Sequence, residues 1–201
     1  MYIPSHFREP DERMLAEFID AYAFGTLVTV EGARPFASHL PFLHDREGRT
    51  LHAHVARGNP QWQHIAANAD VLVMFQGPHG YVSPTWYAKP GVPTWNYTAV
   101  HVYGRARALD DAAATGRHVE RLAARFERGS ATPWVPEYDP RRLSGIVGIE
   151  IAIGEIQGKF KLSQNRSAAD RAGVVAARDA RDTDNDTALA RLVEAAGRKP
   201  G

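Results

Sequence analysis

Two apolar runs that frame a proline-rich aromatic loop constrain the fold of this chain more than any other feature. The runs cover residues 71–75 and 99–103, and both are rich in the β-branched and aromatic residues typical of strands. The segment between them carries four prolines and five large aromatic residues, namely Tyr81, Trp86, Tyr87, Trp95 and Tyr97. Ordered loops of this composition usually cover a site or contact a partner. The alternative is a surface loop whose aromatic residues pack on the chain's own sheet.

The first third of the chain predicts one helix followed by three short strands. Apolar residues recur at helical spacing over residues 11–22, after a proline and an acidic pair that favour a helix start. Strand-like runs then follow at 26–30, 35–42 and 50–55, with turn-like residues between them. Because no helix separates these runs, they indicate an antiparallel sheet or barrel.

The rest of the chain adds a strand and three helices. Residues 105–109 extend the second apolar run, and Asp110 is expected to cap a helix with one apolar face. Residues 146–153 are the most strand-like run in the sequence. These elements predict a mainly β chain with peripheral helices, an α+β fold.

Composition divides the chain into one domain and a short appendage. We expect the domain to cover residues 1–177, and residues 178–201 to hold a charged linker, over 178–186, and a short C-terminal helix. Residues 197–201 are expected to be disordered.

The charge balance argues against nucleic acid as an obvious partner. Lys and Arg number 24 against 23 for Asp and Glu, so the formal net charge is only +1. A protein that wraps nucleic acid usually shows a larger basic excess. Cysteine is absent, which excludes disulfides and thiolate chemistry. The N-terminus does not resemble a signal peptide and no apolar run is long enough to cross a membrane, so we expect a cytoplasmic protein without membrane contact.

The segment from Arg57 to Pro60 is a candidate phosphate site. Asn59 is expected to cap a helix and Pro60 to occupy its first position. Free backbone N–H groups at a helix start, next to an arginine, attract anions, and Gly58 allows a ligand to approach the backbone. The alternative is a capped helix next to an exposed arginine.

The histidines do not form a recognisable metal or catalytic motif. His52 and His54 lie two residues apart on an expected strand and therefore share one face. Two ligands do not complete a zinc site, so we expect both histidines to be hydrogen-bonded and assign no metal. No nucleophile elbow, phosphate-binding glycine loop or paired-carboxylate motif is present, and no catalytic residue is nominated.

Several segments, in order, resemble the PaiB-type FMN-binding negative transcriptional regulators. The resemblance is carried by MYIPSHF at the N-terminus, LHAHVARGNPQW from residue 51, FQGPHGYVSPTWY from residue 75, VPTWNYTAVHVYG from residue 92 and KFKLSQNR from residue 159. This family is a branch of the FMN-binding split-barrel proteins related to pyridoxamine-phosphate oxidase. The resemblance implies a six-stranded antiparallel split β-barrel, a homodimer and an FMN site at the dimer interface.

The resemblance also implies which positions contact FMN. It places the phosphate at the end of the third strand, the flavin edge along the second strand, a further wall after residue 74, and a contribution of the partner subunit from the region that begins at Trp95. The residues so assigned are Ser38, His39, Leu40, Arg57, Gly58, Asn59, Phe75, Gln76, Gly77, Trp95, Asn96, Tyr97, His101, Lys161 and Gln164. Many relatives carry two adjacent basic residues where this chain has Arg57 alone, which predicts weak FMN binding or none. For Lys161 and Gln164 the alternative is a solvated strand end before a capped helix.

Three functions are compatible with these observations. The first is an FMN-binding regulator that lowers transcription, although no helix-turn-helix is recognisable and the charge balance does not support direct DNA binding. The second is an FMN-dependent oxidoreductase, similar to a flavin reductase or oxidase, in which the cofactor carries the chemistry. The third is a dimeric binding protein with a vestigial flavin pocket.

Overall fold

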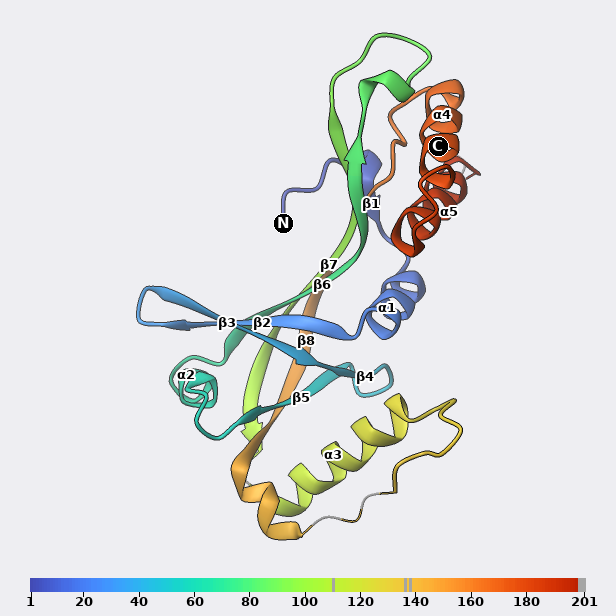
Figure 1. Cartoon of the computed structure of the whole chain (residues 1–201). Coiled ribbons are helices and arrows are strands. Elements are labelled where there is room, and N and C mark those ends of the chain that lie inside the picture. The colour runs from blue at the N-terminus through green and yellow to red at the C-terminus, as the bar shows by residue number, and fades with distance from the viewer. Residues whose placement is uncertain (110, 136, 138, 199–201) are drawn as a thin grey trace. The chain divides into compact units, whose positions relative to one another are not determined.

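Eight strands form one sheet in the described part of the chain, which a computed structural model defines for residues 1–109, 111–135, 137 and 139–198. The order is β3-β2-β6-β7-β8-β5-β4, and β1 pairs with β8 (Figure 1). β2 pairs antiparallel with β3 and β6, β5 pairs antiparallel with β4 and β8, and β1 pairs antiparallel with β8. The strands are β1 (Arg8–Glu9), β2 (Phe24–Glu31), β3 (Arg34–Pro41), β4 (Leu43–Asp45), β5 (Thr50–Ala56), β6 (Asp70–Val82), β7 (Thr94–Leu109) and β8 (Ile146–Lys161).

This sheet confirms the predicted mainly β, antiparallel fold. Six of the strands have seven residues or more, in agreement with the six that the resemblance implies, and the two others have two and three residues. The strand predicted over 146–153 is longer than expected, since β8 continues to Lys161.

Five α-helices lie around the sheet within the described residues. They are α1 (Glu12–Ala21), α2 (Gln61–Ala67), α3 (Ala112–Phe126), α4 (Ala168–Asp179) and α5 (Asp184–Arg198). Short 3-10 helices form at η1 (Ser5–Phe7), η2 (Pro84–Trp86) and η3 (Pro140–Gly145). The expected cap of α3, Asp110, lies outside the described residues, and the carboxylate of Asp111 accepts the N–H groups of Ala113 and Ala114 at 3.1 and 3.0 Å. No helix of the described residues has the length and apolar character needed to cross a membrane.

Contacts within the chain divide it into two compact units. The first unit contains Met1–Leu15, Gln76–Val100 and Gln157–Gly201, and the second contains Ala16–Phe75 and His101–Ile156. β6, β7 and β8 therefore each contribute residues to both units.

The core of the second unit is built by alternation along paired strands. On β5, Leu51, Ala53 and Val55 are at most 2% exposed. Their partners on β8 are Ile151, Ile149 and Val147, also at most 1% exposed. Because successive side chains point to opposite faces of a strand, this register buries one face of β5 and of the segment of β8 that pairs with it.

The opposite face of β5 carries the two histidines and meets a third on α3. His54 Nδ1 lies 3.1 Å from His118 Nε2, and the ring of His118 stacks on His52 at 6.3 Å between centroids. Burial, followed by the proximity of His54 and His52, lowers the pKa of His118 to about 3. Burial also lowers the pKa of His52 and of His54. The histidines are thus neutral and hydrogen-bonded in the folded chain.

These buried histidines predict that stability falls in mild acid. The unfolded chain takes up a proton near pH 6.5, whereas folded His118 does so near pH 3, so the unfolded state binds more protons between these values. We expect the free energy of unfolding to be highest above pH 6.5 and to decrease as the pH falls toward 3. Denaturant unfolding of the His118→Gln variant should show a shallower decrease, and His6→Gln, at an exposed position of the first unit, should follow the parent protein. If the free energy of unfolding of His118→Gln decreased with pH as steeply as that of the parent protein, this account would be contradicted.

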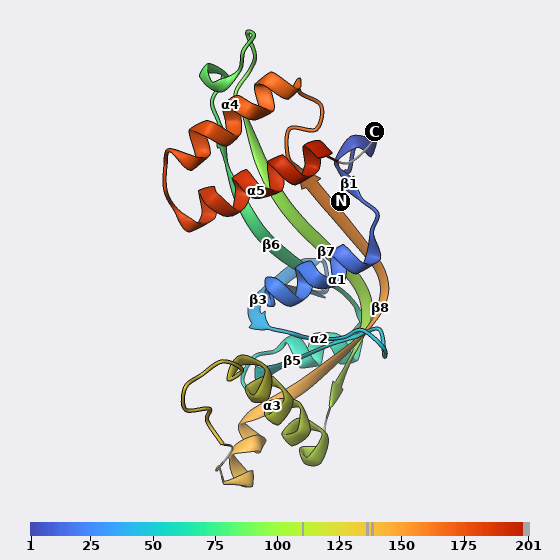
Figure 2. The same ribbon diagram turned by 90° about the vertical axis from the view of Figure 1, so that its right-hand side faces the viewer.

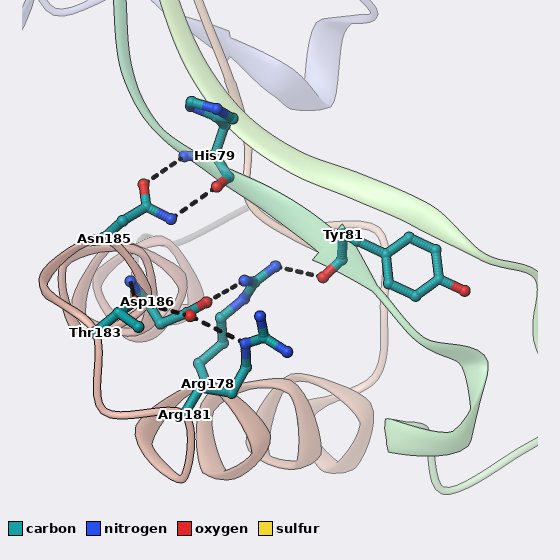
Figure 3. A network of polar contacts seen from close by, with 7 residues as sticks. All are labelled: His79, Tyr81, Arg178, Arg181, Thr183, Asn185 and Asp186. Atoms are coloured by element: carbon teal, nitrogen blue, oxygen red, sulfur yellow. Dashed lines mark hydrogen bonds and ion pairs between the residues drawn. The ribbon is translucent and has the colours of Figure 1, made fainter.

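The C-terminal helices of the first unit are anchored on β6 by a buried polar network. Arg178 forms an ion pair with Asp186, and both side chains are at most 4% exposed. Arg178 Nη2 also donates to the carbonyl oxygen of Tyr81 at 2.5 Å. Asn185 pairs with the backbone of His79 in both directions, at 2.9 and 3.2 Å (Figure 3). The two helices lie side by side in both views (Figures 1 and 2).

This network differs from the charged linker expected over residues 178–186. α4 extends to Asp179 and α5 begins at Asp184, so only four residues connect them. The composition of the segment is that of a linker because its charges are numerous. Two of those charges are nevertheless buried against each other, a pairing that only the tertiary structure creates.

Removal of one partner of the ion pair should destabilise the first unit strongly. Asp186→Ala leaves the Arg178 guanidinium buried without its carboxylate, a change that typically costs about 3–5 kcal/mol. Denaturant unfolding should report this loss. The matched control is Glu194→Ala, which removes an exposed carboxylate of the same helix and should cost less than about 1 kcal/mol. Equal stability of the two variants would show that the pair does not anchor the helices.

Candidate functional site

The second unit contains a polar corner where β5 ends and α2 begins. We name the corner site by its residues Ser38, Arg57, Gly58 and Asn59. Asn59 Nδ2 donates to Ser38 Oγ at 2.9 Å, which joins the end of β5 to β3. Asn59 Oδ1 accepts the backbone N–H of Gln61 at 3.0 Å. The two strands that the resemblance assigns to flavin binding are therefore in contact at this corner.

Gln61 fixes the corner from inside. Its side chain is completely buried, and its Nε2 lies 3.1 Å from the carbonyl oxygen of Leu27 and 3.2 Å from Thr29 Oγ1. A third acceptor, the carbonyl oxygen of Phe36, lies at 3.4 Å. The buried Gln61 amide therefore ties the start of α2 to both β2 and β3 through donors on its Nε2.

Arg57 presents its charge on the exposed side of the corner. Its Nε donates to the carbonyl oxygen of Ser144 at 2.7 Å and its Nη2 to that of Ile146 at 3.1 Å. The Trp62 indole donates to the Arg57 carbonyl oxygen at 3.0 Å, which fixes the backbone. A Cβ added to Gly58 would meet nothing within 4 Å, so open space adjoins the backbone here.

One part of the phosphate hypothesis is wrong. The N–H of Asn59 donates to the carbonyl oxygen of Ala56 at 2.8 Å, and the N–H of Gln61 donates to Asn59 Oδ1. These donors are therefore not available to an anion. α2 has only seven residues and begins directly after Pro60, and the side chain of Asn59 caps its start, as expected, by accepting the N–H of Gln61. Any anion at the corner would be held by Arg57 and the space at Gly58, and not by a helix N-terminus.

The other assigned residues of the second unit have different roles. His39 is exposed and its Nδ1 lies 2.9 Å from Thr26 Oγ1, whereas Leu40 is half-buried on the opposite face of β3. Phe75 is completely buried and its ring lies 5.5 Å from that of Phe42, so its side chain belongs to the core. His101 is half-buried, and burial lowers the pKa of its imidazole.

The remaining assigned residues belong to the first unit. Gln76 is exposed beside His79, with 3.3 Å between their side-chain nitrogens, and Gly77 is buried. Trp95 is 52% exposed and its ring meets Tyr81 edge-on at 6.3 Å. Asn96 is completely buried, and its Oδ1 accepts from Ser163 at 3.1 Å. Asn96 therefore braces the strand, while Trp95 faces solvent.

Two kinds of residue in the KFKLSQNR segment have different roles: Gln164 shapes a turn, and the lysines carry charge. Gln164 folds back on its own loop, since its Oε1 accepts the N–H of Leu162 at 2.7 Å and its Nε2 donates to the carbonyl oxygen of Phe160. Lys161 donates to Thr94 Oγ1 at the base of the aromatic loop. Lys159 lies over the ring of Tyr97, 5.4 Å from its centroid. Gln164 thus shapes the turn, and the lysines supply charge next to aromatic rings.

The aromatic loop is partly packed on the chain's own α4. The guanidinium of Arg178 lies 5.5 Å from the ring centroid of Trp86, and Asp170 accepts the N–H of Ala88 at 2.9 Å. Gly173 leaves no room for a Cβ because the Trp86 carbonyl oxygen fills that space. Trp86 therefore has a packing role inside the subunit, and Trp95 remains as the exposed large aromatic side chain at the start of β7.

Sequence reasoning missed Gln61 and Lys159. Gln61 directly follows the Asn59-Pro60 pair, but a glutamine at a helix start reads as a surface residue, and its burial is visible only in the packed structure. Lys159 could have been predicted from the sequence. It lies two residues before Lys161 on the same strand, so both side chains share one face.

Comparisons with known proteins agree with this architecture. Residues 1–155 match the family described as "Putative FMN-binding domain". The Bacillus subtilis protein named "Protease synthase and sporulation protein PAI 2" is 37% identical over 201 residues, which cover 96% of this chain and 97% of the relative. An uncharacterized Aspergillus fumigatus protein is 30% identical, with 98% of both chains covered.

Similar folds also occur among solved structures. The flavocytochrome Anf3 from Azotobacter vinelandii has a TM-score of 0.64 at 15% identity, covering 79% of this chain and 72% of that chain. The FAD and heme binding protein from Mycobacterium smegmatis has a TM-score of 0.62 at 20% identity, covering 77% and 73%. At these identities the likeness concerns the fold alone. Since the family match covers more than half of the chain and the B. subtilis relative is similar over nearly its full length, this chain belongs to the family described as "Putative FMN-binding domain".

Proposed function

We propose that this protein binds FMN with the phosphate at the corner site. The observation that carries the proposal is an exposed arginine, fixed through two backbone carbonyls, next to open space at Gly58. A phosphate dianion needs a cation and room to approach the backbone, and both are present. Ser38 on β3 and Asn59 in the turn before α2 supply polar groups beside it. FMN, when bound, would supply hydride or electron transfer, and the residues of the corner would hold and orient it.

A homodimer is the second part of the proposal. Trp95 is 52% exposed, and Tyr81, which it contacts, is 46% exposed. Exposed aromatic pairs of this kind are enriched at protein interfaces. We assign this pair to the contact with a second copy of the chain, which would then bring its Trp95 and Tyr97 toward the flavin of the first copy.

The proposed cellular role is that of a cytoplasmic FMN-binding negative regulator of transcription. Support comes from the resemblance of the whole chain to PaiB-type proteins and from the B. subtilis relative, whose name refers to protease synthesis and sporulation. The net charge of +1 gives direct DNA binding no additional support. A salt-sensitive shift of promoter DNA by the FMN-loaded protein is the result that this role requires if the protein acts on DNA directly.

An FMN-dependent oxidoreductase is the alternative, and one observation favours it. Lys159 and Lys161 lie beside aromatic rings in a half-buried position, an environment that suits a small charged molecule. Consumption of a reduced nicotinamide cofactor in the presence of FMN would support this role. If neither DNA binding nor redox activity accompanies FMN binding, a purely ligand-binding dimer is the remaining function.

Replacement of Arg57 should weaken FMN binding. An ionic hydrogen bond contributes about 1.5–3 kcal/mol, so Arg57→Ala should raise the Kd for FMN by about 10- to 100-fold in a fluorescence titration. Arg34→Ala removes an exposed arginine from β3 and serves as the control with unchanged affinity. Thermal unfolding of each variant separates lost binding from lost folding, because Arg57 also contacts Ser144 and Ile146. Equal FMN affinity in Arg57→Ala and the parent would refute the corner site.

Replacement of Trp95 should weaken dimerisation and FMN binding together. Trp95→Ala removes an exposed ring without opening a cavity in the core, so the monomer should remain folded. Sedimentation analysis should show a shift toward the monomer, with a parallel decrease in FMN affinity. Val92→Ala, at another exposed apolar position of the loop, is the matched control. A Trp95→Ala dimer of parental strength would exclude this surface from the interface.

A further inference from the structure

Three cations gather beneath the aromatic loop of the first unit. We name Lys159, Lys161 and Arg166 the basic cluster. Lys159 and Lys161 share one face of β8 because they are two residues apart on a strand. All three are half-buried, and each lies over an aromatic ring: Lys159 over Tyr97, Lys161 over Phe7 and Arg166 over Tyr87, at 5.4, 5.9 and 4.4 Å from the ring centroids. The side chain of Arg166 also approaches Gly91 of the loop.

The basic cluster has no carboxylate partner within the described residues. Lys159 Nζ donates to the carbonyl oxygen of Tyr2 at 2.9 Å, and Lys161 donates to the Thr94 hydroxyl, so both acceptors are neutral. No ion pair within 4.0 Å joins any of the three cations to Asp or Glu in residues 1–109, 111–135, 137 and 139–198. Burial, followed by the charges of Lys159 and Arg166, lowers the pKa of Lys161.

The carboxylate of Asp170, on which the charge of Arg166 acts, is already engaged. Burial acts to raise the pKa of the Asp170 carboxyl, but hydrogen bonds from Ser167, Ala88 and Lys89, and then the charge of Arg166, lower it; its Oδ1 accepts the backbone N–H of Ala88 at 2.9 Å. Asp170 is also only 7% exposed. Asp170 therefore fixes the aromatic loop on α4 and offsets part of the Arg166 charge, whereas Lys159 and Lys161 have no ion pair with a carboxylate among the described residues.

We propose that the basic cluster binds the oxyanion group of a small ligand other than FMN, a phosphorylated or polycarboxylate molecule. Like charges that are held together while half-buried cost free energy unless an anion neutralises them. Lysine and arginine together offer donors for several oxygens of one anion. This inference deepens the proposed function, on which it rests for the ligand's role, since the anionic molecule would be a substrate or effector of the flavin site. Binding of the anion itself can be tested without that role.

Inorganic pyrophosphate is a suitable probe for a phosphorylated ligand, and citrate is a suitable probe for a polycarboxylate ligand. In calorimetric titrations of the full chain saturated with FMN, we expect saturable binding of one probe. The preferred probe identifies a phosphate or a carboxylate ligand. Lys161→Gln should weaken this binding at least about tenfold, as expected for loss of an ionic hydrogen bond. Arg191→Gln, which removes an exposed cation from α5, should bind like the parent.

The unfolding temperature of the ligand-free variants separates an anion-binding role from a purely structural role of the cluster. If the cations await an anion, Lys161→Gln relieves repulsion, and the unfolding temperature of the ligand-free protein should stay the same or rise. A large decrease in unfolding temperature with no probe binding to the parent would overturn the proposal. The Lys159→Gln variant repeats the test at the neighbouring position.

Two further outcomes would also overturn it. Displacement of FMN by the probe would show that the cluster holds the phosphate of FMN itself. Displacement of the probe by a short single-stranded oligonucleotide, with steep salt dependence, would assign the cluster to nucleic acid. The corner site is tested separately by Arg57→Ala. If this variant lost FMN binding while the parent protein bound neither probe, the inference about the basic cluster would be rejected and the proposed function would stand.

Discussion

The hydrogen bonds of the buried Gln61 amide are the interaction on which the corner site depends. This side chain is completely excluded from solvent and reaches acceptors on β2 and β3 from the first residue of α2. Because an unpaired Nε2 group in the same place would cost about 1–3 kcal/mol, the direction in which the chain leaves β5 is restricted. Asn59 and Arg57 are then placed at the exposed side of the turn, with Ser38 in contact from β3. A surface site is thus defined by a polar group in the interior.

The near-zero net charge conceals an uneven distribution of ion pairs. In the second unit Asp20 faces both Arg46 and Arg125, and Asp45 faces Arg121. In the first unit Asp186 is used by the C-terminal helices and Asp170 by the aromatic loop. The basic cluster is left without such a partner among the described residues. A total charge of +1 therefore excludes a broad nucleic-acid surface more readily than it excludes a local anion site.

The strands were predictable from local pattern, whereas the roles of individual side chains were not. Alternation and turn residues located β2, β3 and β5, since burial of one face imposes a period of two on the sequence. Phe75 shows the limit: its position in a family pattern indicated a ligand wall, but packing against Phe42 buries it. The stretch around Arg178 and Asp186 reads as a linker because a charged residue is usually solvated, and only the β6 contact makes its burial possible.

The most direct test of the corner site compares FMN with riboflavin, which has the same ring system but no phosphate. Calorimetric titration of both ligands into the parent protein and into Arg57→Ala isolates the contribution of the phosphate. Our account predicts at least about tenfold tighter binding of FMN by the parent and a much smaller difference in the variant. Equal affinities of the parent for FMN and riboflavin would show that Arg57 and Gly58 do not hold a phosphate.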